Sequence, residues 1–127
     1  MKIVYGQVEN LFKALEALKT QPQSFSIARK LKDTRDAVIK EREWCSEQIR
    51  LLVDQFGEKD EDGKLAVDNA GGYRLADPQG FTEAFGELLS TQTVDIPSLS
   101  EEMLQCFTVS AEQLDDLMLI VEVSNDV

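Results

Sequence analysis

Histidine is absent from the 127 residues, and the chain has only two cysteines and three prolines. Histidine is the commonest general base and a frequent metal ligand, so its absence removes the usual chemistry of hydrolases and transition-metal sites. Cys45 and Cys106 fall on predicted apolar helix faces without a close-spaced partner, which favours two buried free thiols over a disulfide between them. From these absences we expect no enzyme activity, no bound metal and no cofactor.

Long hydrophobic runs are also missing. No apolar run approaches the ~20 residues that a membrane-spanning helix needs. The first six residues, MKIVYG, do not begin the apolar core and small-residue cleavage site of a signal peptide. We therefore expect a chain that is not secreted and makes no membrane contact. The hydrophobic fraction of 43% and the length predict one globular domain, residues 1–127.

Positive charge is missing from the last part of the chain. The net charge is −11, and residues 75–127 carry eleven acids and no base, whereas residues 1–74 carry thirteen of each. Without an excess of cations to displace phosphate counterions, the chain is not expected to bind nucleic acid. The acidity indicates either simple solubility or a surface that attracts a basic protein partner. The candidate partner-binding acids are Glu101, Glu102, Asp115 and Asp116.

One long stretch has no helix breaker. Residues 24–56 contain neither Pro nor Gly and are rich in Lys, Arg, Glu, Ala and Leu, which predicts a helix from about Ser26 to Phe56. A stripe spaced alternately by three and four residues runs along it, as in the seam between packed helices. Its members are Ala28, Leu31, Arg35, Val38, Arg42, Cys45, Ile49, Leu52 and Phe56.

Arg35 and Arg42 interrupt this apolar stripe, and Trp44 lies close to them in sequence. A covered guanidinium needs carboxylates or an aromatic face, so these three residues are further candidates for partner binding. In that interpretation the arginines pair with acids of a second copy or of the C-terminal half. The alternative is that the stripe leaves the core there and the arginine stems extend into solvent. Residues 29–42 hold six bases and three acids, a basic patch that is either a solvated face or a site for a charged small molecule.

A shorter amphipathic helix is predicted at residues 7–19, and Pro22 ends it. Ser24 or Ser26 is expected to cap the long helix with its side chain. The short connection predicts that the two helices are antiparallel neighbours, an αα-hairpin over residues 7–56.

A polar, Gly-rich segment follows, with Gly57 expected as a left-handed cap of the long helix. The acidic loop after it begins like a calcium-binding loop but has Leu65 and Gly71 where such a loop requires Gly and Glu, so we expect no calcium. Alternating runs at residues 64–67 and 73–75 predict a β-hairpin.

Asp77 and Pro78 are expected to begin a further helix, as cap and first-turn proline, that continues to Leu89. Residues 91–96 alternate and predict a third strand beside the hairpin. Residues 64–96 would then hold a hairpin, a helix and a strand.

Two capping boxes are predicted in the last part of the chain, Ser98 with Glu101 and Ser110 with Gln113. They predict C-terminal helices at residues 99–107 and 111–121, within a helical region 98–121, and residues 123–127 are expected to fray. No internal repeat is evident. The fold class predicted is α+β, mainly α, with a helical hairpin, a small β-hairpin or three-stranded sheet, and short C-terminal helices.

This order of turns and caps, from the helical hairpin through FGEKDEDGK, the strand pair ending at Tyr73, residues 81–89, TVDI and the two capping boxes, resembles a family of small phage and prophage proteins of unknown function. The resemblance implies a protein made in a bacterial cytoplasm. The function expected first is a non-catalytic accessory protein that binds a host or phage protein. The alternatives are a virion structural or assembly protein acting as an oligomer, and a protein that sequesters a charged small molecule.

Overall fold

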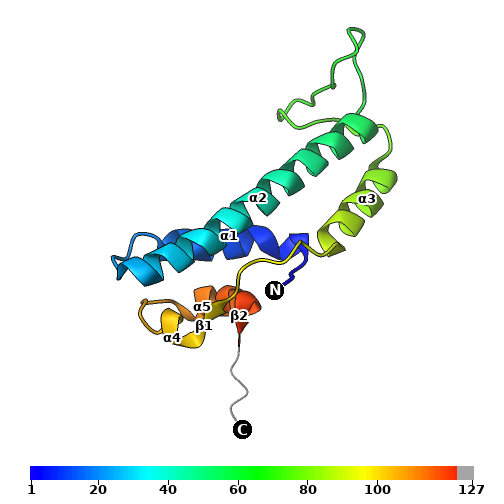
Figure 1. Cartoon of the computed structure of the whole chain (residues 1–127). Coiled ribbons are helices and arrows are strands. Elements are labelled where there is room, and N and C mark those ends of the chain that lie inside the picture. Colours follow the sequence, from blue (N-terminus) through cyan, green and yellow to red (C-terminus); the bar gives the residue numbers. More distant parts are fainter. Residues whose placement is uncertain (123–127) are drawn as a thin grey trace.

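A computed structural model describes residues 1–122 and has the expected class, α+β and mainly α (Figure 1). The long helix and the short helix before it follow the predicted order, whereas the β structure differs from the prediction. The elements in chain order are η1 (Tyr5–Gln7), α1 (Val8–Leu18), α2 (Phe25–Phe56), α3 (Pro78–Ser90), β1 (Leu99–Ser100), α4 (Glu101–Leu104), α5 (Ala111–Leu117), η2 (Met118–Ile120) and β2 (Val121–Glu122).

Helix α2 forms over 32 residues because nothing in it breaks a helix, and its bounds confirm the prediction within one residue. Ser24 is its N-cap residue, but the cap is made by backbone alone: the Ala28 amide donates to the Ser24 carbonyl at 2.9 Å, and no serine side chain caps the helix. The predicted side-chain cap is therefore wrong. The αα-hairpin is confirmed by two ion pairs. Glu9 near the start of α1 pairs with Arg42 of α2, and Glu16 near the end of α1 pairs with Arg35, which comes earlier in α2, so the two helices are antiparallel.

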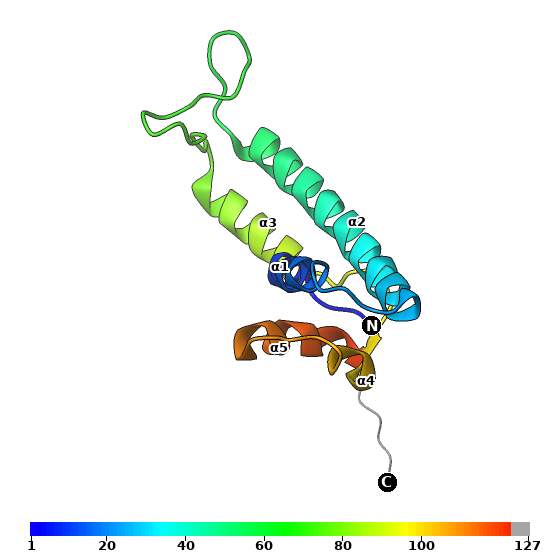
Figure 2. The ribbon, with the colours of Figure 1, turned by 90° about the vertical axis from the view of Figure 1, so that its left-hand side faces the viewer.

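Helix α1 is the middle layer of the protein, between α2 on one side and α5 on the other (Figures 1 and 2). Because both of its faces are covered, Leu11, Leu15 and Leu18 are completely buried. Leu117 and Ile120 from the C-terminal part are also completely buried. These side chains form the centre of the apolar core, and each large aliphatic residue buried there contributes roughly 1.5–3 kcal/mol of transfer free energy.

The buried stripe of α2 is shorter than the predicted one, since Ala28 is exposed and Ile49, Leu52 and Phe56 are only partly buried, and it also differs at the two arginine positions. Thr34 and Glu41 are buried, whereas Arg35 and Arg42 lie on the flank of the stripe beside α1. Polar residues occupy the seam because backbone groups there need partners: the Thr34 hydroxyl donates to the Pro97 carbonyl at 3.0 Å. The full buried set of α2 is Leu31, Thr34, Val38, Glu41 and Cys45.

Beyond Cys45, α2 continues away from the core and packs against α3, which returns alongside it (Figures 1 and 2). Asp77 caps α3 as predicted, accepting from the Gly80 amide at 3.1 Å. Phe56 meets Phe81 edge to face, with ring centroids 6.4 Å apart. We call residues 46–56 together with α3 the arm. No residue of the arm is buried, because only two helices form it and no third layer covers them.

The segment 57–76, which we call the distal hairpin, projects past the end of α2 (Figure 1). Gly57 has an extended backbone with φ −73°, so the predicted left-handed cap is wrong. Glycine suits this position for another reason: a Cβ there would lie 2.5 Å from the Val53 carbonyl oxygen. The predicted pairing of the two runs is present as the bridge between Val67 and Tyr73, without an extended ladder.

The distal hairpin contains an eight-residue repeat that the sequence analysis missed. Its backbone bonds form a ring: the Glu58 amide donates to the Arg74 carbonyl at 2.7 Å, that of Arg74 to Ala66 at 3.0 Å, and that of Ala66 to Glu58 at 2.8 Å. Asp60 and Asp68, also eight residues apart, each cap a turn by accepting from the amides two and four residues later at 2.9–3.0 Å.

In both turns a glycine follows three residues after the aspartate. Gly63 and Gly71 have φ of 77° and 85°, the left-handed region that glycine adopts without a steric penalty. The two copies of the repeat therefore share their backbone hydrogen bonds, their aspartate caps and their left-handed glycines, whereas the other residues of the two copies differ.

Residues 91–97 do not join the hairpin as a third strand, and that prediction is wrong. They instead run beside the first residues of the chain, with the Thr93 amide donating to the Ile3 carbonyl and that of Ile96 to Met1, both at 2.8 Å. The first residues are apolar and provide a nearer unpaired backbone edge than the hairpin, which lies at the other end of the arm (Figure 1).

The C-terminal elements are shorter than predicted. Ser100, rather than Ser98, caps α4 by accepting from the Met103 amide at 3.2 Å, because Leu99 and Ser100 are extended and pair in parallel with β2. The predicted helix 99–107 is thus the single turn of α4, and the predicted helix 111–121 is α5 followed by η2. The capping box of Ser110 with Gln113 is confirmed. The predicted fraying of residues 123–127 lies outside the described residues.

Candidate functional site

Arg35 and Arg42 are held by carboxylates of α1, not by the C-terminal half as one interpretation expected. Arg35 Nε donates to Glu16 Oε1 at 2.5 Å, and Arg42 Nε donates to Glu9 Oε2 at 2.7 Å. The Arg42 guanidinium also lies over the Phe12 ring, 4.4 Å from its centroid. The hydrogen bond from Arg42 holds the pKa of Glu9 below its ordinary value. Both arginines therefore join α1 to α2 within the chain.

Trp44 stacks on Tyr5, with ring centroids 4.9 Å apart, and remains 45% exposed. Beneath it the Tyr5 hydroxyl donates to Glu41 Oε2 at 2.7 Å. Burial, and then the neighbouring Glu41 carboxylate, raise the pKa of Tyr5 above its ordinary value. Glu41 is 6% exposed, and its second oxygen accepts from the Val94 amide at 3.1 Å. This cluster fixes residues 93–96 against α2.

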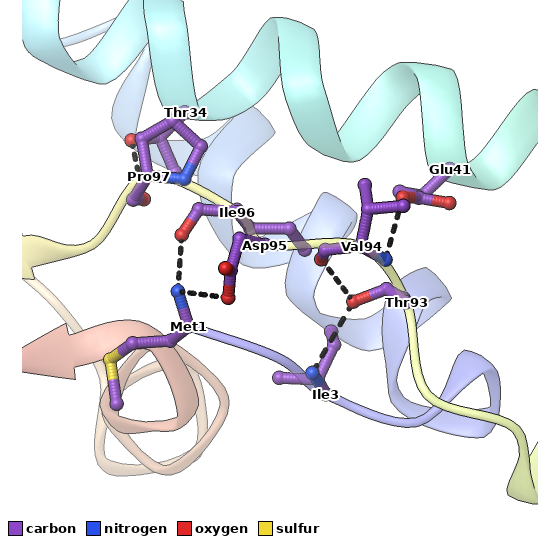
Figure 3. Close-up of polar contacts among 9 residues, drawn as sticks. All are labelled: Met1, Ile3, Thr34, Glu41, Thr93, Val94, Asp95, Ile96 and Pro97. Carbon is purple, nitrogen blue, oxygen red and sulfur yellow. Dashed lines mark hydrogen bonds and ion pairs between the residues drawn. The ribbon is translucent and has the colours of Figure 1, made fainter.

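Figure 3 shows how the segment 93–97 is held between the start of the chain and α2. The Thr93 hydroxyl accepts from the Ile3 amide at 3.3 Å and donates to the Val94 carbonyl at 2.9 Å. The amino group of Met1 donates to the Ile96 carbonyl at 2.6 Å and lies 3.7 Å from Asp95. Every buried side-chain nitrogen or oxygen among residues 1–122 has a hydrogen-bond partner. The cluster is therefore satisfied by protein groups and has a structural role.

The two cysteines are free and differ in environment. Cys45 is buried in the seam as expected, and burial raises the pKa of its thiol. Cys106 is exposed, so the expectation that both thiols are buried is wrong. It lies just after α4, which ends sooner than the predicted helix 99–107, so the apolar periodicity of that longer helix does not apply to it.

An apolar hollow of about 500 Å³, which we call the C-terminal groove, lies on the surface formed by α4, α5 and the loop between them. Leu114 and Met118, one helical turn apart, are 40% and 38% exposed beside it. It is lined by Glu101, Leu104, Gln105, Phe107, Val109, Leu114 and Met118.

The four candidate acids do not form one surface. Glu101 lines the C-terminal groove, and Asp115 is exposed next to Leu114. Glu102 is exposed in the first turn of α4, whereas half-buried Asp116 lines a separate hollow with Lys13 of α1. The structure thus brings one of the four to an apolar hollow.

Periodicity did not single out two features in or beside the basic patch. Phe25, at the first position of α2, is 80% exposed, and Arg29 lies one turn after it beside a shallow hollow. Lys32 and Arg35 of the patch face a second hollow together with Lys19 of α1.

Among residues 1–122, no cluster of three or more acids, cysteines or histidines is placed to hold a metal ion. In the same range, no helix combines the length and the apolar character that crossing a membrane requires.

Glu41, Thr34 and the C-terminal groove were not predicted from the sequence. Glu41 and Thr34 each stand one position before a predicted seam arginine, and a polar residue gives no apolar signal. The groove requires α5 to turn back beside α4, which periodicity within either helix does not indicate.

Comparisons of the chain with protein-family models, with curated proteins and with solved structures found no match, so the resemblance to small phage proteins gains no support from them.

Proposed function

We propose that this chain is a non-catalytic protein-binding protein that engages a basic amphipathic segment of a partner at the C-terminal groove. The observation that carries the proposal is an apolar groove with Glu101 at its edge, in a part of the chain that has acids and no base. Apolar side chains of a partner helix would fill the groove, and flanking Lys or Arg would meet the surrounding acids.

The resemblance to small phage proteins implies a bacterial cell during phage growth as the setting for this activity. In that setting the partner is a host or phage protein, and binding takes place in the bacterial cytoplasm. Electrostatic steering by a chain of net charge −11 would speed association with a basic surface.

The proposal is tested with a labelled synthetic peptide that has Leu at helical spacing and Lys between. Saturable binding is expected by fluorescence anisotropy, with weaker affinity at high salt because exposed charges are screened beyond about 10 Å at 0.1 M. Glu101→Lys should raise the dissociation constant, whereas Glu87→Lys on α3, which makes the same charge change away from the groove, should not.

A second peptide with the same Lys residues and Ser in place of Leu separates apolar docking from charge alone. Equal binding of the two peptides, or equal effects of the two charge reversals, would contradict docking in the groove and leave the acidity as a property of the whole surface.

A second candidate function is structural, as a protein that assembles with copies of itself through the arm. The specific observation in its favour is that the arm consists of two packed helical segments without a buried residue, and that Leu51 on it is 45% exposed. A further copy would supply the third layer that the arm lacks.

A further inference from the structure

A hollow of about 260 Å³ lies where the end of α1, the α1–α2 connection and the first turns of α2 meet the loop after α4. Three cationic side chains line it, Lys19 from the residue after α1 and Lys32 and Arg35 from α2. Leu31 and Phe107, both largely buried, provide an apolar floor. The hollow thus combines converging positive charge with apolar surface, the arrangement typical of a small-molecule site.

We propose that this hollow binds a small anionic compound, a phosphate or carboxylate carried on an apolar body. The anion would lie against Lys19, Lys32 and Arg35, and the apolar body against Leu31 and Phe107. This site is separate from the protein-binding function proposed above and does not depend on it.

The cations retain hydrogen-bonding capacity for a ligand. Arg35 uses Nε for Glu16, and its two terminal amino groups make no hydrogen bond to any residue in the range 1–122. Lys32 uses one donor for Asp36 at 2.6 Å, and Lys19 pairs with Glu16. An ammonium has three donors and a guanidinium five, so several remain.

The local charge also favours an anion. Three cations and no acid line this hollow in a chain of net charge −11, and the carboxylates that pair with these cations, Glu16 and Asp36, lie outside the lining. Sharing Glu16 between Lys19 and Arg35 holds the cations in place without fully neutralising them. A bound anion would complete this ion-pair network.

The walls are fixed before a ligand arrives. The Gln21 side chain exchanges two hydrogen bonds of 2.9 Å with the backbone of Thr108, and Gln23 Nε2 donates to the Cys106 carbonyl at 2.6 Å. These bonds hold Phe107 at the rim of the helical hairpin. Preorganisation of this kind lowers the entropic cost of binding.

The test uses the full chain and three probes, phenyl phosphate, benzoate and inorganic phosphate, with phenol as the neutral analogue. Isothermal titration should show saturable binding of phenyl phosphate or benzoate, tighter than that of inorganic phosphate, and none of phenol. Arg35→Gln should raise the dissociation constant about 10-fold or more, the loss expected for one charge-assisted hydrogen bond.

Arg42→Gln is the matched control, because Arg42 is also an arginine of α2 paired with a glutamate of α1 but lines a different hollow, about two turns further along the helix. Its affinity should stay within about twofold of the unaltered chain. If Arg35→Gln disturbs folding, Lys32→Gln replaces it, since Lys32 is 70% exposed and its only ion pair among residues 1–122 is with Asp36.

Absence of saturable binding by all three anions would overturn the proposal. Equal weakening by Arg35→Gln and Arg42→Gln would also overturn it, because the effect would then be general electrostatics. Binding of inorganic phosphate as tight as that of phenyl phosphate would contradict the proposed contact of an apolar body with Leu31 and Phe107.

Discussion

Glu41 is a carboxylate on the buried side of α2 that accepts two hydrogen bonds, from the Tyr5 hydroxyl and from the Val94 amide. No cation pairs with it among residues 1–122, so neutral donors alone compensate its burial. It thereby joins three distant parts of the chain, residues 5, 41 and 94. We infer that Glu41 matters more to stability than any exposed acid.

Replacing Glu41 separates this role from general charge effects. Glu41→Leu leaves two buried donors without an acceptor, at about 1–3 kcal/mol each, so the free energy of unfolding should fall by roughly 2–6 kcal/mol. Glu41→Gln keeps an acceptor and should cost less. Urea unfolding followed by circular dichroism provides the measurement, and exposed Glu43→Gln, expected within about 0.5 kcal/mol of the unaltered chain, is the control. Equal stability of the Leu and Gln variants would contradict the bonding described.

Tyr5 should make the stability fall at alkaline pH. Burial and the nearby Glu41 carboxylate raise its pKa in the folded state above the ordinary value of about 10. A folded pKa above the unfolded one means that this contribution is complete below pH ~10 and is lost as the pH rises toward the folded value. Burial raises the pKa of Cys45 too, which adds a loss of the same sign.

The contribution of Tyr5 is isolated by difference. Tyr5→Phe should be less stable than the unaltered chain at pH 7, because it loses a buried hydrogen bond, and the gap should shrink toward pH 11. Free energies of unfolding at both pH values test this, with exposed Tyr73→Phe as control. A gap that stays constant with pH would show that the Tyr5 phenol does not titrate differently in the folded state.

At the scale of elements, much of the helical structure could be predicted from the sequence and little of the β structure. The bounds of α2 follow from the absence of Gly and Pro over residues 24–56. The starts of α3 and α5 follow from local caps at Asp77 and Ser110. The two caps depend on residues within four positions and the long helix on a continuous stretch of sequence, so both can be predicted without knowledge of distant contacts.

The parts that failed depend on distant contacts. Residues 91–96 alternate like a strand of the hairpin, yet pair with the start of the chain. Arg35 and Arg42 were recognised as groups needing carboxylates, but their partners Glu16 and Glu9 are set by how α1 lies on α2. The hollow at Lys19 and Lys32 likewise exists only once the hairpin has closed.

The two turns of the distal hairpin should behave as equivalents. Asp60→Ala removes the acceptor of the Asp62 and Lys64 amides, and Asp68→Ala removes that of the Ala70 and Gly72 amides. Each variant should speed hydrogen exchange at its own pair of amides, corresponding to roughly 1 kcal/mol per lost bond.

Exchange measured by nuclear magnetic resonance distinguishes the two sites. The exposed Glu61→Ala, in the first turn, removes an acid that makes no hydrogen bond among residues 1–122 and should leave the rates unchanged. Faster exchange throughout the segment 57–76 from one aspartate variant alone would show that the ring of backbone bonds opens as a unit, contrary to two independent turns.

At the scale of the whole molecule, packing is concentrated at one end. Helices α1 and α5 and the first half of α2 enclose the buried side chains, whereas the arm and the distal hairpin extend away from them (Figure 2). An amphipathic helix pair that buries nothing completely leaves apolar surface in contact with water. The arm is therefore the surface through which the second candidate function, self-assembly, would take place.

Self-assembly through the arm predicts a mass that rises with protein concentration and returns to that of one chain in Leu51→Lys. Leu51 is 45% exposed, so the new charge should cost little within one chain but would be buried against a second copy, where an unpaired charge is strongly unfavourable. Sedimentation equilibrium gives the mass, and urea unfolding confirms that the variant keeps its stability.

Val94→Lys is the control. It places the same charge on a side chain that is 67% exposed beside the core, and it should assemble like the unaltered chain. One mass at every concentration for all three proteins would contradict self-assembly through the arm, and loss of assembly in Val94→Lys alone would place the interface beside the core.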